Sequence, residues 1–151
     1  MTNEALKIAL MNWNAALVFE EGGEWLNILV TADQWKPLAK ALHTLPEFNC
    51  NYLFCLTCVD WKTHLTMVYH LTSLQWQHNL VIKSVLNRDN PEIETVSDIW
   101  KAADFLEREV YELFGVNFIN HPDLRRLILT DDFNGWPLRK DFEDPVNMIK
   151  L

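Results

Sequence analysis

Cys55 and Cys58 form a C-x-x-C pair, the first arrangement in this chain that could carry chemistry. Such a pair acts as a redox dithiol when its first cysteine begins a helix, because the helix N-terminus stabilises the thiolate. The neighbouring residues are mostly apolar and indicate a buried strand, in which residues 55 and 58 face opposite sides. Zinc and iron–sulfur sites need about four ligands, and no second C-x-x-C occurs. We therefore expect buried, unreactive thiols, with a thiol oxidoreductase that uses this pair as an alternative.

Other active-site templates fail on spacing. The five histidines form neither H-x-x-x-H nor H-E-x-x-H, which argues against a helical zinc site. His70 lies in a strand-like run and is interpreted as a structural histidine, and Asp131 and Asp132 are interpreted as solvated turn residues. The four glycines cannot form G-x-G-x-x-G or a Walker loop, so neither type of phosphate site is expected. We predict no catalytic, cofactor-binding or metal-binding residue on this chain.

A stretch dense in charge, residues 107–141, holds the remaining candidates. Arg108 lies four residues from both Asp104 and Glu112, and the simplest interpretation is a ladder of ion pairs along one helix face. Each such pair contributes roughly 0.2–0.5 kcal/mol. The ladder explains Arg108 but leaves the residues that follow the helix without a role.

Residues 130–151 lack hydrophobic periodicity, yet they contain Phe133, Trp136 and Phe142. Four of the chain's 13 Lys and Arg residues also fall between residues 125 and 140. Ordering such a segment costs roughly 1–2 kcal/mol per residue, and disordered tails are usually poor in aromatics. Because Trp and Arg are typical of interface hot spots, we predict an extended arm that docks on a partner protein. Packing of the arm onto its own domain is the alternative.

The hydrophobic pattern predicts the elements that must position these residues. A first helix is expected at residues 4–11, and a second runs from a capping box at Thr31 and Gln34 to about residue 44. A third is expected at residues 98–114, with Ser97 as its N-cap and Gly115 as the left-handed residue beyond its end. The last helix would bury Ile99, Ala103, Leu106, Val110 and Leu113. Strands are expected at residues 15–20, 25–30, 48–60, 63–71 and 78–87, with Leu65, Met67, Tyr69 and Leu71 on one side of the fourth.

This order of elements predicts an α+β fold. Short turns between consecutive strands favour antiparallel pairing. We expect two layers, with a mixed, mostly antiparallel sheet of about five strands and helices on one face. Residues 1–129 would form this domain, and residues 130–151 would form the extended C-terminal arm.

Length and composition fit one globular domain. The chain has 151 residues, of which 49% are hydrophobic and 23% charged. Its net charge of −8 argues against nucleic acid or an anionic membrane as the main partner. The N-terminus resembles neither a secretory signal nor a transit peptide, and no apolar run approaches the roughly 20 residues of a membrane span. Three cysteines indicate free thiols in a reducing compartment, and we expect contact with a membrane only through partners.

Two blocks of the charged stretch match one family signature. The first reads E-R-E, two residues, an acid, two apolar residues, six residues, a histidine and then a basic residue, and the second reads G-x-P-L-R-K-D. With the residues that accompany each block, they comprise Glu107, Arg108, Glu109, Glu112, Gly115, His121, Pro122, Arg125 and Arg126, and Gly135, Trp136, Pro137, Leu138, Arg139, Lys140 and Asp141. The step Val59–Asp60 after a buried strand also fits. The chain thus resembles the 30 kDa subunit of respiratory complex I, the proton-pumping NADH:quinone oxidoreductase.

The resemblance implies a non-catalytic structural and assembly subunit of the peripheral, hydrophilic arm, which supports electron transfer from NADH to quinone. It implies contacts with the large quinone-site subunit of the 49 kDa type and with iron–sulfur subunits, so FMN and iron–sulfur clusters are expected on partners. The location would be peripheral, on the cytoplasmic side of the bacterial inner membrane. We expect Glu107, Arg108 and Glu109 to hold the helix. Trp136 would anchor the arm on a neighbour, and Arg139 would form charge-assisted pairs there.

Two other interpretations stay open. Relatives of the family occur in membrane-bound nickel–iron hydrogenases and formate hydrogenlyases, so the chain could be the equivalent subunit of such a complex. The other is a globular domain that works alone and has a disordered tail.

Overall fold

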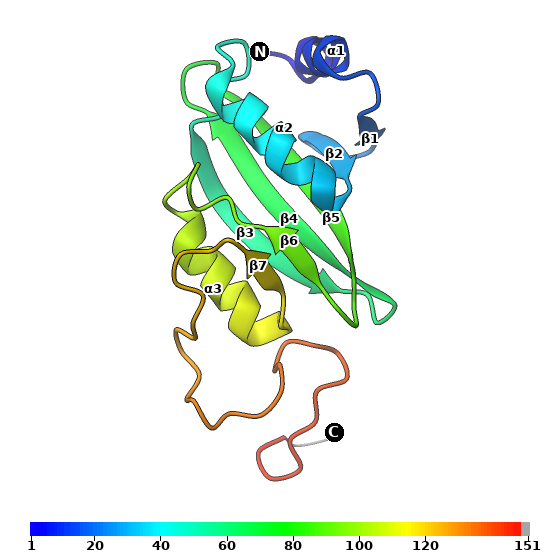
Figure 1. The fold of residues 1–151 in the computed structure, drawn as a ribbon. Helices are drawn as coiled ribbons and strands as arrows, with labels where there is room; N and C mark the ends of the chain where they lie inside the picture. Colours follow the sequence, from blue (N-terminus) through cyan, green and yellow to red (C-terminus); the bar gives the residue numbers. More distant parts are fainter. Residues whose placement is uncertain (149–151) are drawn as a thin grey trace.

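A five-stranded mixed sheet forms one layer of the molecule, and the two longer helices lie on one of its faces (Figure 1). The computed structural model describes residues 1–148. The elements in chain order are α1 (Asn3–Trp13), β1 (Val18–Glu20), β2 (Leu26–Val30), α2 (Ala32–Thr44), β3 (Tyr52–Asp60), β4 (His64–Ser73), β5 (His78–Asn87), β6 (Glu92–Glu94), α3 (Ala103–Phe114) and β7 (Asn117–Ile119). This arrangement confirms the predicted α+β class.

The sheet has the strand order β1-β2-β5-β4-β3, and only β2 and β5 pair in parallel. The first two strands form the predicted antiparallel hairpin, although each is shorter than expected. β3 begins at Tyr52 rather than at residue 48, because the chain is still bound to α2 before that point: the Cys50 N–H donates to the Leu42 carbonyl oxygen at 2.8 Å. β5 has the predicted bounds and lies inside the sheet, between β2 and β4.

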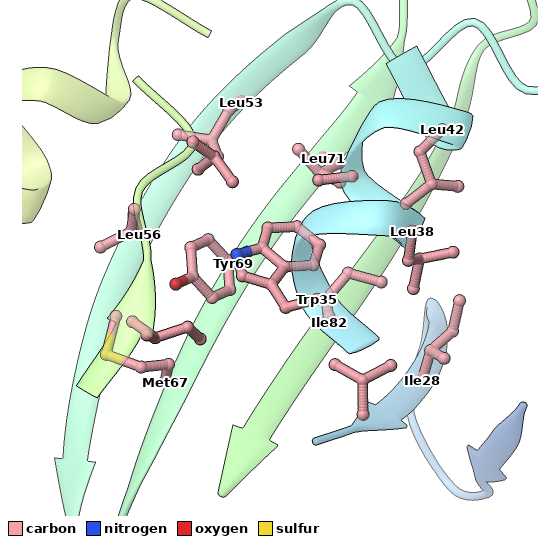
Figure 2. Close-up of a cluster of buried hydrophobic side chains, with 14 of the residues drawn as sticks. Ile28, Trp35, Leu38, Leu42, Leu53, Leu56, Met67, Tyr69, Leu71 and Ile82 are labelled. Atoms are coloured by element: carbon pink, nitrogen blue, oxygen red, sulfur yellow. The ribbon is translucent and has the colours of Figure 1, made fainter. Parts of the chain in front are cut away.

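The capping box predicted at the start of α2 is present. The Thr31 side chain accepts from the backbone of Gln34, and Gln34 Oε1 accepts the Thr31 N–H at 3.1 Å. Trp35, Leu38 and Leu42 then face the sheet and are fully buried or nearly so. Figure 2 shows Trp35 beside Tyr69 of β4 at the centre of the cluster, with 4.3 Å between the ring centroids. The four residues predicted on one side of β4 are all buried, which confirms the periodicity.

The start of α3 corrects the prediction of a helix from residue 98. Residues 98–102 form turns, the N-cap is Ala102, and Ser97 has no capping role. The reason is a carboxylate inside the helix. Glu107 accepts the backbone N–H of Val96, and this bond holds the residues between Val96 and the helix in a turn. The predicted apolar stripe is only partly correct, because Ile99, Leu106 and Leu113 are half-buried while three charged residues of α3 are buried. Gly115 has φ = 73°, the predicted left-handed conformation.

Two short strands were not predicted. β6 and β7 pair in parallel and form a separate two-stranded sheet near α2. They are three residues each and lack an alternating pattern long enough to detect. Among residues 1–148, no helix is both long and apolar enough to cross a membrane.

Candidate functional site

The C-x-x-C cysteines lie within β3, so neither of them begins a helix. Cys58 is buried and Cys55 is half-buried, and both are free thiols. Burial raises the pKa of the Cys58 thiol to about 12, so the reactive thiolate is scarce at neutral pH. This geometry lacks the features that activate a redox dithiol and disfavours the thiol oxidoreductase alternative.

The histidines of the sheet have structural surroundings. His70 packs between the rings of Trp25 and Phe54, with centroid distances of 5.6 and 5.5 Å, and burial lowers the pKa of its imidazole. Within residues 1–148, no group of three or more His, Cys, Asp or Glu side chains is placed to hold a metal ion. The candidate site is therefore the polar face of α3 and the segment that follows it, residues 120–148, which we call the C-terminal segment.

Glu107 is fully buried on α3. Its Oε1 accepts the backbone N–H of Val96 at 2.8 Å, and its Oε2 accepts the hydroxyl of Thr95. Burial disfavours the charged carboxylate and raises the pKa of Glu107 to about 7, although both hydrogen bonds favour the charged form. The first glutamate of the family signature thus connects α3 to the chain before it.

His121 connects the start of the C-terminal segment to the same helix. Its side chain is fully buried, and Nδ1 accepts the backbone N–H of Asp123 at 3.0 Å. Because an accepting ring nitrogen carries no proton, the neutral imidazole carries its proton on Nε2. That nitrogen lies 3.2 Å from the Asp104 carbonyl oxygen, 3.4 Å from Asp104 Oδ1 and 3.7 Å from Glu107 Oε2. His121 therefore donates to the Asp104 carbonyl oxygen, and the carboxylates of Asp104 and Glu107 lie close to the same nitrogen.

Arg108 does not form the predicted ion-pair ladder. Its Nε donates to the Arg125 carbonyl oxygen at 3.0 Å and its Nη2 to the Arg126 carbonyl oxygen at 3.4 Å. No ion pair joins it to Asp104 or Glu112 among the described residues, since these carboxylates face other groups. Arg108 is only 7% exposed, so its role is to hold the backbone of the C-terminal segment and not to lie on a solvated helix face.

Glu112 binds three consecutive backbone groups. Its carboxylate accepts the N–H groups of Leu127, Ile128 and Leu129 at 3.0–3.1 Å. The side chain is buried, while Ile128 is 71% exposed. A buried carboxylate thus fixes a loop that presents an aliphatic side chain to solvent.

The C-terminal end of α3 is capped by the second signature block. The last carbonyl groups of a helix have no partner within it and need one elsewhere. The Leu138 N–H donates to the Leu113 carbonyl oxygen at 3.1 Å, and Arg139 Nε donates to the Phe114 carbonyl oxygen at 2.7 Å. A cation at this end also interacts favourably with the helix dipole.

Trp136 lies directly on Gly115. A Cβ atom at residue 115 would fall 2.3 Å from the indole ring, so the glycine is needed both for its positive φ and for this contact. The guanidinium of Arg139 lies over the same indole at 4.3 Å from its centroid. Trp136 remains 44% exposed. Packing on its own domain and exposure to a partner are therefore compatible for this residue.

Asp60, at the end of β3, is a second point of attachment. Its carboxylate accepts Arg88 Nε at 3.0 Å, Arg88 Nη2 at 2.9 Å and the Lys140 N–H at 2.8 Å. Arg88 also forms a bidentate pair with Asp141, at 2.7 and 3.1 Å. The hydrogen bonds from Arg88 hold the pKa of Asp60 well below its ordinary value. Residues 136–141 thus pack onto the chain's own domain.

Other predicted residues are peripheral to these contacts. Glu109 is half-buried and forms no hydrogen bond or ion pair with any described residue. Arg125 pairs with Asp123 on the surface at 3.0 Å, and Arg126 donates to the Thr130 carbonyl oxygen at 2.6 Å. Pro122 and Pro137 are exposed and half-buried. The last three residues of the predicted arm, 149–151, lie outside the described residues.

Sequence reasoning missed Arg88 and Thr95 as members of the site. Asp60 was noticed only through the step Val59–Asp60. Arg88 follows a strand in a turn-like run, and nothing in that run indicates a partner 28 and 53 residues away. Thr95 similarly precedes the helix that holds Glu107. These side chains acquire their roles only in the folded chain, where segments far apart in sequence come together.

Comparison with known proteins places this geometry among respiratory subunits. Residues 28–146 match the family model of the respiratory-chain NADH dehydrogenase 30 kDa subunit. The chain is 41% identical over 128 residues to the C subunit of NADH-quinone oxidoreductase from Moorella thermoacetica, covering 83% of this chain and 85% of that protein. It is 47% identical over 105 residues to the longer C/D subunit of the oxidoreductase from Phocaeicola vulgatus, covering 68% of this chain. It spans only 20% of the length of that longer relative.

A solved structure is also similar. A chain of the membrane-bound sulfane sulfur reductase, an archaeal respiratory membrane complex, matches with a TM-score of 0.80 and 26% identity. The match covers 93% of this chain and 85% of that one. The similarity therefore extends over nearly the whole chain.

Proposed function

The chain belongs to the 30 kDa subunit family of the respiratory-chain NADH dehydrogenase, and on this premise we propose that it is a structural and assembly subunit of the peripheral arm of an NADH:quinone oxidoreductase. It has no catalytic activity alone and supports electron transfer from NADH to quinone by holding other subunits in place. FMN and the iron–sulfur clusters belong to those partners.

The observation that supports this proposal best is the C-terminal segment. Buried polar side chains of α3 fix its backbone, yet it keeps large apolar side chains in solvent: Ile128 is 71% exposed, Leu138 53% and Trp136 44%. Burying polar side chains to order a segment that exposes apolar and aromatic groups is typical of a preorganised interface.

The partners in this proposal are the large quinone-site subunit of the 49 kDa type and neighbouring iron–sulfur subunits. The longer relative is a combined C/D subunit. Because fused domains commonly lie together, it supports direct contact between this chain and the subunit that corresponds to the D part. The chain would sit peripherally on the cytoplasmic side of the inner membrane and reach the membrane only through other subunits.

Affinity purification of the native assembly through this chain, followed by mass spectrometry, tests the proposal. We expect subunits of an NADH:quinone oxidoreductase to co-purify in equal amounts with the chain. Recovery of the chain alone from a membrane that contains the complex would exclude the assembly role. In a parallel purification of an Ile128→Ala variant, whose side chain is 71% exposed, we expect fewer bound subunits at an unchanged melting temperature of the isolated chain.

A second candidate is the equivalent subunit of a related membrane-bound redox complex, such as a hydrogenase or formate hydrogenlyase. The similarity to a chain of the archaeal sulfane sulfur reductase complex favours it specifically. The same purification separates the candidates, because co-purification of a nickel–iron subunit in place of an NADH-oxidising one would select the second.

A further inference from the structure

Two neighbouring cations of the C-terminal segment, Arg139 and Lys140, differ from the cations that form ion pairs within the chain. Lys36, Lys83, Arg88 and Arg125 each pair with a carboxylate of the chain itself. Arg139 and Lys140 pair with none among the described residues, although the chain carries a net charge of −8. Each instead lies over an indole: Arg139 at 4.3 Å from the Trp136 centroid and Lys140 at 5.8 Å from that of Trp61.

Arg139 has the geometry of a carboxylate receptor. Its Nε is bound to the Phe114 carbonyl oxygen, and the Trp136 ring holds the plane of the guanidinium. Its two terminal nitrogens donate to no described residue. A planar guanidinium with both terminal nitrogens available matches a carboxylate in a bidentate pair, and fixing the side chain beforehand lowers the entropy cost of binding.

A hollow beside Arg139 gives a partner side chain room to enter. It measures about 370 Å³ and is lined by Arg139, the Trp136 indole, Asn134 and Phe142, and also by Asp141 and Glu143. The hollow therefore combines a cation, an amide and two aromatic walls with two carboxylates, of which that of Asp141 is already paired with Arg88. The room beside the Arg139 guanidinium is where an acidic side chain of a partner would enter.

Lys140 extends this surface onto the β3–β4 turn. Its backbone N–H is bound by Asp60, and this places its ammonium over Trp61, which is 55% exposed. Arg139 and Lys140 thus lie next to each other in sequence, and each is flanked by an exposed tryptophan. The exposed indoles favour a protein partner over an anionic bilayer, which the charge of the whole chain would repel.

We propose that Arg139 and Lys140 receive two carboxylates of an acidic segment in a neighbouring subunit, with Trp136 and Trp61 packed against that segment. This inference rests on the proposed function, because it names the chemistry of the partner at the same interface.

Zero-length carbodiimide coupling of the native assembly tests the inference, since the reagent joins a lysine amine to a carboxylate in direct contact. Peptide mass spectrometry should find Lys140 coupled to an Asp or Glu of another subunit. Lys140 that stays uncoupled, or that couples only within its own chain, in an assembly that contains the chain would overturn the inference while the proposed function stands. Failure of the chain to co-purify at all would instead refute the proposed function.

Two substitutions measure the strength of the contact. Arg139→Gln should weaken association with the rest of the assembly roughly 10-fold or more, because the partner carboxylate loses its charge-assisted pair. Among the described residues, the Lys140 ammonium interacts with Trp61 alone, and Lys140→Gln leaves the backbone bond to Asp60, so folding is preserved and association should weaken several-fold. The matched control is Arg125→Gln, whose guanidinium is already paired within the chain. Equal affinity of all three variants and the unchanged chain would contradict the inference.

A lipid headgroup is the competing source of negative charge. The isolated chain should not bind phosphatidylglycerol vesicles. Binding to these vesicles that Lys140→Gln and Arg139→Gln abolish would replace the acidic protein partner with a membrane surface.

Discussion

The two longer helices, α2 and α3, pack on the same face of one sheet by different means. α2 inserts an apolar stripe centred on Trp35 into the core and buries no charged side chain. α3 buries Glu107, Arg108 and Glu112. Together they bind the backbone before the helix and the backbone of the C-terminal segment.

The difference separates two ways of ordering a chain. Apolar burial holds α2, and its free energy is shared by many contacts. The C-terminal segment has no core of its own, and individual hydrogen bonds from buried groups order it. Losing one such group leaves a buried donor or acceptor without a partner, and that costs about 1–3 kcal/mol. We therefore expect changes on α2 to affect the whole domain and changes on α3 to affect the C-terminal segment first.

Trp35→Ala should have the largest effect. The side chain is fully buried against Tyr69 and Trp100, and a cavity of this size costs about 3–5 kcal/mol of the free energy of unfolding. Urea denaturation monitored by circular dichroism measures it. The control is Phe105→Ala on α3, which removes an aromatic ring that is 62% exposed and should cost less than about 1 kcal/mol. Equal losses in the two variants would remove the distinction between the helices.

Glu107 should make stability depend on pH. Its pKa is about 7 in the folded chain against 4.5 for the ordinary side chain, so the folded state binds more protons. The contribution of Glu107 to stability is fully present below pH 4.5 and falls by about 3 kcal/mol as the pH rises to 7. Denaturation of the wild type and Glu107→Gln across this range checks it, and the variant should lack the fall.

Asp60 supplies a contrast with the opposite sign. Its pKa is lowered in the folded chain, so its stabilisation is lost as the pH falls below about 3.8, outside the window of Glu107. A wild-type chain whose stability stays constant between pH 4.5 and 7 would show that Glu107 does not carry the raised pKa.

Glu112→Gln should loosen the C-terminal segment without unfolding the domain. The variant exposes an amide NH₂ to three backbone N–H donors that the carboxylate now satisfies. We expect a local cost of about 1–3 kcal/mol, seen as faster hydrogen exchange at residues 127–129. Glu109→Gln is the matched control, since Glu109 has no hydrogen-bond partner among the described residues. Exchange that rises equally across β3–β5 would mean that Glu112 supports the core instead.

Gly115→Ala should have the smallest effect of the four. The positive φ and the displaced Trp136 ring together cost about 1–2 kcal/mol. Detachment of the segment should speed tryptic cleavage after Arg139. In a Trp136→Ala background the same substitution should cost less, because only the backbone strain remains. An undiminished cost in that background would show that the ring does not rest on Gly115.

Local rules predicted the elements with strong periodicity or a cap. The capping box of α2, the left-handed Gly115 and the bounds of β5 all follow from neighbours in sequence, and the structure confirms them. The predicted start of α3 was wrong because Glu107, ten residues beyond Ser97, binds the backbone of Val96 and overrides the local preference of Ser97 for an N-cap position. The predicted ion-pair ladder at Arg108 was wrong for a similar reason. The spacing of the charges fits a ladder, but the guanidinium donates to backbone carbonyl groups beyond the helix.

The sequence by itself determined the fold class, the apolar faces and, through its two signature blocks, the family. These depend on periodicity and on residue order, which the chain carries openly. Only the tertiary structure decided that the signature residues serve as attachments for the C-terminal segment, that Asp60 and Arg88 join them, and that Arg139 and Lys140 stay free of carboxylates among the described residues. The physical reason is that a polar side chain's role is set by the partner it meets. Here that partner lies up to 80 residues away.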